Sequence, residues 1–212
     1  MNLFLNALNG TQVYPLTDRH ISGLSHEQQI VALGSSGARI VQLREKELEG
    51  REFYAEAAAA ISTAHQQRVR IIVNDRVDIA LACDADGVHL GQEDLPLRAA
   101  KKLISDKIIG ISTHDAEQAK EAEAGGADYI GFGPMFATTT KETGYAARGL
   151  DMLAQVRGAV KLPIVAIGGI TENNVAQVWQ SGADSAAVIS DILGAEEIAP
   201  KIKRILAHQP AS

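Results

Sequence analysis

The sequence predicts a single (β/α)8 barrel, and three observations carry that prediction. Eight short runs rich in β-branched residues alternate with Ala-rich amphipathic stretches along all 212 residues. Continuously apolar strands separated by helices are typical of a parallel sheet covered by helices. An open dinucleotide-binding sheet would carry a glycine-rich loop after its first strand, and residues 15–23, PLTDRHISG, contain none. Eight units in a chain of this length therefore favour the closed TIM barrel.

The first four strand–helix units lie in the amino-terminal half of the sequence. The segment QVYPLT begins the pattern, and each later apolar run follows a helical stretch such as SHEQQIVALGSSG or GREFYAEAAAAISTAHQQR. The helical period of these stretches separates them from the short apolar runs. The first four predicted strands are 12–17, 39–43, 70–74 and 87–90.

The last four units repeat the same order. The phrases SGAR (36–39), GGAD (125–128) and SGAD (181–184) each stand where a helix ends and a strand begins, as glycine helix stops do. The remaining predicted strands are 107–112, 128–133, 163–168 and 185–190. We expect one barrel domain over 1–212, with a short N-terminal extension over about residues 1–11.

The amino-acid composition argues against several kinds of binding partner. The net charge of −6 and pI near 5.5 argue against nucleic-acid binding, and no apolar run reaches the ~18 residues of a membrane span. The single cysteine, Cys83, excludes an intrachain disulfide and a multi-cysteine zinc site, so a cytoplasmic location is expected. Small molecules remain the expected partners. The oligomeric state stays open, with a homo-oligomer among the alternatives.

Charged side chains follow the second predicted strand directly, in RIVQLREKELEG (39–50). The active sites of barrels lie at the carboxyl ends of their strands, so Arg44 and Lys46 are expected to face a shared mouth, with Lys141 joining them from a later loop. Three converging cations suit a ligand with several negative charges. The alternative is a solvated charged face at a helix start.

Two acidic residues follow neighbouring strands, Asp75 after the third and Asp94 after the fourth. Magnesium commonly takes one or two carboxylates and completes its shell with water and phosphate oxygens, so the pair is a candidate Mg²⁺ site. The alternative is that each aspartate caps the helix that follows it.

A second anion site is expected where the seventh and eighth strands end. Gly168 and Gly169 allow close approach to backbone N–H groups, and Ser190 adds a hydroxyl. The corresponding loops of many barrels bind a phosphate. His89, inside an apolar strand, is expected to be a packed or hydrogen-bonded core residue rather than a catalyst.

Seven motifs in register resemble those of the thiamine-phosphate synthase family: QLREK (42–46), ND (74–75), DGVHLGQEDL (86–95), GISTH (110–114), GFGPMFATTTK (131–141), VAIGGI (165–170) and AAVIS (186–190). The resemblance implies a transferase that joins 4-amino-2-methyl-5-(diphosphooxymethyl)pyrimidine to a thiazole phosphate, releasing pyrophosphate. It also implies a dissociative, Mg²⁺-assisted substitution.

The roles implied by the resemblance fall into three groups. The pyrimidine diphosphate would be held by Gln42, Leu43, Arg44, Glu45, Lys46, Asn74, Ser112 and Lys141, of which Arg44, Lys46 and Lys141 are the expected catalytic residues. The thiazole phosphate would be held by Thr138, Thr139, Thr140, Gly169, Ile189 and Ser190. Mg²⁺ would be held by Asp75 and Asp94.

Three alternatives stay open at this point. One is a thiazole tautomerase of the same fold, which needs neither the cationic strand exit nor the paired aspartates. Another is a non-catalytic barrel that senses thiamine precursors. The third is an unrelated phosphate-binding isomerase or aldolase, which would usually carry a buried Lys or Glu inside a strand.

Overall fold

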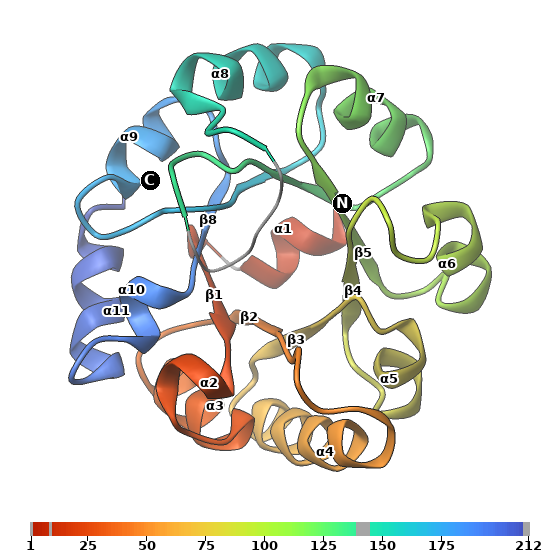
Figure 1. Ribbon diagram of the computed structural model, residues 1–212, viewed down its shortest axis with the longest axis vertical. Helices are drawn as coiled ribbons and strands as arrows, with labels where there is room; N and C mark the ends of the chain where they lie inside the picture. The colour runs from red at the N-terminus through yellow and green to blue at the C-terminus, as the bar shows by residue number, and fades with distance from the viewer. Residues whose placement is uncertain (1, 9, 139–144, 210–212) are drawn as a thin grey trace.

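The computed structural model describes residues 2–8, 10–138 and 145–209, and its eight parallel strands close into a barrel. Each strand pairs in parallel with the next, and the last pairs with the first (Figure 1). The predicted (β/α)8 fold is confirmed. The strands are β1 (Val13–Thr17), β2 (Ile40–Leu43), β3 (Arg70–Asn74), β4 (Gly87–Leu90), β5 (Ile108–Thr113), β6 (Tyr129–Phe132), β7 (Ile164–Ala166) and β8 (Ser185–Val188).

The last two strands end two residues earlier than predicted. β7 stops at Ala166, before Gly168 and Gly169, whose positive φ angles of 90° and 67° turn the chain out of the sheet. β8 stops at Val188 because Ser190 begins a short helix rather than ending a strand.

Helices surround the barrel as an outer ring, and the larger apolar core lies between the two layers (Figure 1). Local signals start several of them: Ser25 and Gln28 form a capping box before α3, and Asp115 accepts from the N–H of Gln118 before α7. No helix of the described residues combines the length and apolarity needed to cross a bilayer. The ring consists of α2 (Arg19–Ser22), α3 (His26–Ser35), α4 (Gly50–Gln66), α5 (Val77–Ala82), α6 (Leu97–Leu103), α7 (Ala116–Ala124), α8 (Gly149–Ala159), α9 (Val175–Gln180), α10 (Ser190–Leu193) and α11 (Ile198–Ala207).

The segment before the first strand contains a helix, α1 (Leu3–Leu8), that crosses the centre of the ring in Figure 1. Phe4 is fully buried and stacks on Tyr129, with ring centroids 4.0 Å apart. It packs in an inner apolar cluster with Ile40, Ile108 and Tyr129, each the first residue of its strand. The helix therefore closes the amino end of the barrel and leaves the carboxyl end for the site.

Candidate active site

A cavity opens at the carboxyl end of the barrel and collects side chains from most of the strand exits. Two of its walls differ in chemistry, because charged residues follow β2 and β3 while glycines follow β7. The cavity is lined by Tyr14, Leu16, Gln42, Arg44, Lys46, Asn74, His89, Ser112, Pro134, Thr138, Val165, Ile167, Gly168, Gly169, Ile170, Ala187, Ile189 and Ser190.

Nine residues that the resemblance assigns to the two substrates line this one cavity. Three other predictions, Thr139, Thr140 and Lys141, lie outside the described residues. The nine are Gln42, Arg44, Lys46, Asn74, Ser112, Thr138, Gly169, Ile189 and Ser190. Their roles toward substrates stay predictions, but the barrel brings them together as expected.

The two cations that follow β2 each meet a carboxylate from a neighbouring strand exit. The Arg44 guanidinium pairs with Asp18 of the loop after β1, and the Lys46 ammonium pairs with Asp75. Asp18 is fixed in turn, because it accepts from the N–H of Ile21 at 3.1 Å and donates its own N–H to Gln29 at 2.9 Å. Arg44 is therefore held at the wall of the cavity rather than in open solvent.

The other two residues of QLREK turn away from the cavity. Leu43 is fully buried in the apolar layer between barrel and helices. The Glu45 carboxylate folds back onto its own loop, where it accepts from the N–H groups of Lys46 and Glu47 at 2.8 and 2.7 Å. Since side chains alternate along extended chain, only Gln42, Arg44 and Lys46 present side chains to the ligand space.

Asp75 and Asp94 lie close enough for their carboxylates to interact. Asp75 holds a left-handed backbone with φ of 62°, and Asp94 accepts from the N–H of Gly91 at 2.6 Å. Burial raises the pKa of Asp94, the Gly91 N–H opposes that rise, and repulsion from Asp75 adds to it. Neither aspartate caps a helix, because α5 and α6 have Arg76 and Pro96 at their N-cap positions, without side-chain caps.

This carboxylate pair fits a divalent cation. Two neighbouring carboxylates that repel each other are stabilised as a pair when a cation lies between them. Among the described residues, no group of three or more His, Cys, Asp or Glu side chains could hold a metal alone. A cation at this pair would therefore draw its remaining ligands from water or a bound phosphate, as Mg²⁺ usually does.

A chain of buried hydrogen bonds forms the floor of the cavity. The hydroxyls of Tyr14 and Tyr129 lie 3.0 Å apart, and Gln42 donates to Tyr14 at 3.4 Å. His89 bridges Tyr129 and Ser112, with 2.9 Å at each ring nitrogen. Burial raises the pKa of both tyrosines, so both keep their protons.

The expectation that His89 is a hydrogen-bonded core residue is confirmed, and its ring also orients the Ser112 hydroxyl at the cavity wall. The two tyrosines were not predicted as part of the site. The only signal in the sequence is an aromatic hydroxyl inside an otherwise apolar strand, in QVYPLT and DYIGFG.

The wall after β7 is made of backbone. A Cβ added to Gly168 would lie 2.7 Å from the Cβ of Pro134, and one added to Gly169 would lie 2.7 Å from the carbonyl oxygen of Ala137. Asn174, which the sequence did not single out, donates to the Gly169 carbonyl at 3.0 Å. Ile189 and Ser190 complete this wall where α10 begins.

Comparison with known proteins identifies the family of the chain. A family model described as thiamine monophosphate synthase matches residues 13–192. The chain belongs to the thiamine monophosphate synthase family. The matched range contains every predicted site residue from Gln42 to Ser190, as well as Tyr14, Asp18, Tyr129 and Asn174.

Individual members of the thiamine monophosphate synthase family cover nearly the whole chain. The thiamine-phosphate synthase of Chloroflexus aurantiacus is 45% identical over 92% of this chain and 91% of its own. That of Syntrophomonas wolfei is 45% identical over 91% of this chain and 93% of its own. The solved thiamine phosphate pyrophosphorylase of Pyrococcus furiosus superposes with a TM-score of 0.86 at 36% identity, covering 94% of this chain and 96% of that one.

Proposed function

We propose that this protein is a thiamine-phosphate synthase, which joins the pyrimidine diphosphate to the thiazole phosphate and releases pyrophosphate. The observation that carries the proposal is the single cavity with a cationic wall after β2 and a glycine wall after β7. Two anionic substrates need two anion sites within reach of each other, and one cavity offers both. The names of the relatives that match this chain support the same reaction.

The cationic wall acts on the leaving group. When the bond between the pyrimidine methylene carbon and the diphosphate oxygen breaks, the electron pair leaves with pyrophosphate, whose negative charge grows. Arg44 and Lys46, already positioned, stabilise that growing charge more than they stabilise the ground state. Lys141 has the same role in the proposal and lies outside the described residues.

The second bond forms between the thiazole nitrogen and the methylene carbon. The aminopyrimidine ring carries the positive charge between the two steps, so the substitution is dissociative and requires no protein nucleophile. The Ser112 hydroxyl, oriented by His89, holds the pyrimidine or the departing pyrophosphate. The buried floor beneath it keeps water from the reacting carbon.

Asp75 and Asp94 are the proposed ligands of Mg²⁺. The ion would supply additional positive charge for the phosphate oxygens of the pyrimidine substrate. Lys46, which pairs with Asp75, links this ion site to the cationic wall.

The thiazole phosphate is assigned to the opposite wall. Backbone N–H groups near Gly169, Ile189 and Ser190 can donate to phosphate oxygens without a bulky side chain in the way. Thr138, and beyond the described residues Thr139 and Thr140, add hydroxyl donors from the loop after β6.

A direct assay tests the proposed reaction. Purified protein is mixed with the pyrimidine diphosphate, the thiazole phosphate and Mg²⁺, and pyrophosphate and thiamine phosphate are followed together, with an EDTA control. We expect both products in equal amounts and only with the metal. Binding of thiazole phosphate without turnover would instead indicate a tautomerase or a sensor. A cytoplasmic location belongs to the same proposal.

A further inference from the structure

The loop that follows β2 presents its charges in opposite directions. Arg44 and Lys46 line the cavity, whereas the Glu45 carboxylate lies inside the protein with only 4% of its side chain exposed. Burying an ionised carboxylate is unfavourable unless hydrogen bonds or an opposite charge compensate. The groups that contact the Glu45 carboxylate therefore show how its buried charge is compensated.

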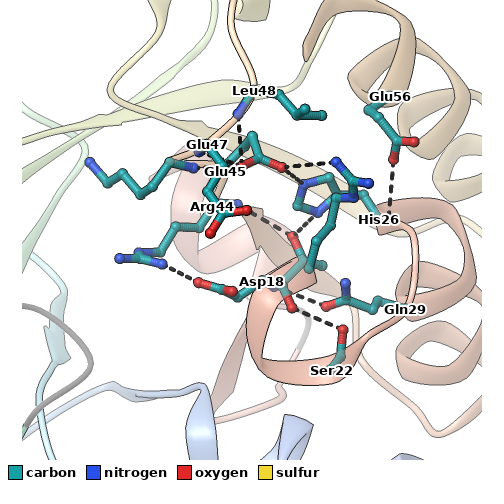
Figure 2. A network of polar contacts seen from close by, with 12 residues as sticks. Asp18, Ser22, His26, Gln29, Arg44, Glu45, Glu47, Leu48 and Glu56 are labelled. Carbon is teal, nitrogen blue, oxygen red and sulfur yellow. Dashed lines mark hydrogen bonds and ion pairs between the residues drawn. The ribbon is translucent and has the colours of Figure 1, made fainter. Parts of the chain in front are cut away.

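The Glu45 carboxylate is bonded through both of its oxygens. Oε1 accepts from the N–H groups of Lys46, Glu47 and Leu48, at 2.8, 2.7 and 3.2 Å. Oε2 lies 3.1 Å from Nε2 of His26, the first residue of α3 (Figure 2). The backbone N–H groups of the three residues that follow Glu45 therefore all point to the Glu45 carboxylate.

The backbone on the amino side is fixed through the same histidine. Arg44 donates its N–H to the Thr17 hydroxyl at 3.3 Å, and that hydroxyl lies 2.8 Å from Nδ1 of His26. An ionised Glu45 carboxylate can only accept, so Nε2 of His26 carries the proton that faces it. The neutral ring then accepts at Nδ1 from the Thr17 hydroxyl, whose other acceptor, the Gln42 carbonyl, is farther away at 3.5 Å. The result is a closed ring of hydrogen bonds that begins at the N–H of Arg44 and returns at the N–H of Lys46.

The pKa directions agree with this assignment of protons. Burial lowers the pKa of His26, and Glu45 opposes that only in part. Burial raises the pKa of Glu45, but the N–H groups of Glu47 and Leu48 and the His26 contact outweigh it and leave the pKa lowered. A neutral imidazole therefore donates to an ionised carboxylate.

We propose that His26 and Glu45 are positioning residues, which hold the loop after β2 so that Arg44 and Lys46 engage the diphosphate of the pyrimidine substrate. The inference rests on the proposed function, since it assigns the diphosphate to these two cations. His26 is fully buried and lies outside the cavity lining, so it acts only through the loop. The backbone N–H of His26 also donates to Glu56 of α4, at 3.4 Å. This bond connects α3, where His26 lies, to α4, which follows the loop.

The test compares two replacements of His26. Leucine keeps much of the buried volume but removes both hydrogen bonds, whereas glutamine can still donate from near the position of Nε2. In His26→Leu we expect the KM for the pyrimidine diphosphate to rise about 10- to 100-fold, because small misplacements of binding groups have effects of that size. The KM for the thiazole phosphate should stay within about twofold, and His26→Gln should recover most of the loss.

Ile30→Val is the matched control for a structural effect. Ile30 lies on the same helix and is fully buried in the core, so the variant should lower the Tm by a few degrees and leave both KM values unchanged. Glu45→Gln is a second variant in case His26→Leu does not fold. It keeps an oxygen for the loop N–H groups, and we expect the same selective rise in KM at a smaller size.

A binding measurement separates this inference from the proposed reaction. Calorimetric titration with pyrophosphate and Mg²⁺ needs no turnover, and we expect weaker binding in His26→Leu but not in Ile30→Val. If wild type forms no thiamine phosphate but shows this pattern, the proposed reaction fails and the positioning role stands. Two results in folded His26→Leu would overturn the positioning role: equal rises in both KM values, or no change in either KM or the pyrophosphate affinity. Turnover by the wild-type protein would still uphold the proposed reaction.

Discussion

In the proposed function, the two walls of the cavity bind anions by opposite means. The wall after β2 and β3 uses long cationic side chains, each held by a carboxylate from another strand exit: Arg44 by Asp18 and Lys46 by Asp75. The wall after β7 uses glycines at φ of 90° and 67°, with the Gly169 carbonyl held by Asn174. The first wall depends on charge, and the second depends on backbone shape.

That difference predicts how each wall responds to change. Removing a cation leaves the backbone in place but takes one ion pair from a carboxylate, so charge-dependent binding should suffer most. Adding one methyl group to the glycine wall changes no charge but forces the backbone to move. Substitutions on the two walls should therefore separate the two substrates.

The largest effect is expected for Arg44→Ala. The variant loses a preorganised cation at the leaving group, and losses of about 100- to 1,000-fold in kcat are usual for such groups. Steady-state kinetics with both substrates checks this. Arg39→Ala, an exposed arginine just before β2, is the control and should behave like wild type. A kcat for Arg44→Ala within a factor of a few of wild type would remove Arg44 from the chemical step.

Gly169→Ala should have the next largest effect, on the other substrate. A Cβ 2.7 Å from the Ala137 carbonyl, on a residue with positive φ, costs about 1–3 kcal/mol in strain or displacement. We expect the KM for thiazole phosphate to rise about tenfold or more, with the pyrimidine KM little changed. Gly158→Ala in α8 is the matched control, because its Cβ would meet nothing within 4 Å. A selective loss of pyrimidine binding in Gly169→Ala would reverse the assignment of the walls.

Asp75→Asn is expected to have a smaller effect, seen chiefly in the Mg²⁺ requirement, although it also removes the ion pair with Lys46. The amide is a weaker ligand for Mg²⁺ than the carboxylate, so the Mg²⁺ concentration for half-maximal activity should rise about tenfold. Titration of activity with Mg²⁺ measures it. Asp78→Asn, at a largely exposed aspartate one turn away, provides the control. An unchanged titration would exclude Asp75 from the metal site.

The smallest effect concerns stability and pH on the charged wall. Burial lowers the pKa of His26 below its ordinary value of 6.5, so the unfolded chain binds this proton more readily than the folded one. Stability is therefore lost as pH falls below about 6.5 towards the folded pKa. The Tm of His26→Gln, measured from pH 8 to pH 5, should fall less steeply than that of wild type. An identical slope in His26→Gln would contradict the linkage.

The barrel could be predicted because its signal is local. Apolar strands such as 70–74 and 87–90 match the observed β3 and β4 residue for residue, and the glycine helix stops mark their neighbours. The cationic exit was visible for the same reason, since Arg44 and Lys46 directly follow an apolar run. Family resemblance then added Thr138 and Ile189, which no local pattern distinguishes.

The missing parts of the site depend on contacts between distant residues. Tyr14 meets Tyr129 across 115 positions, and Arg44 meets Asp18 across 26. The inward turn of Glu45 depends on His26, which in the sequence is one polar residue among several at a helix start. No periodicity identifies such pairs, and the same holds for Phe4, which packs at the end of the barrel against the distant Tyr129.

The ion pairs of the cationic wall also bear on how the product leaves. A diphosphate that reaches Arg44 and Lys46 must compete with Asp18 and Asp75, so binding exchanges one partner for another and yields less net affinity than bare cations would. After the reaction, the ion pairs of Arg44 with Asp18 and of Lys46 with Asp75 form again as pyrophosphate leaves. Under the proposed function, we therefore expect Asp18 and Asp75 to limit inhibition by the product pyrophosphate, so that weaker binding allows faster release.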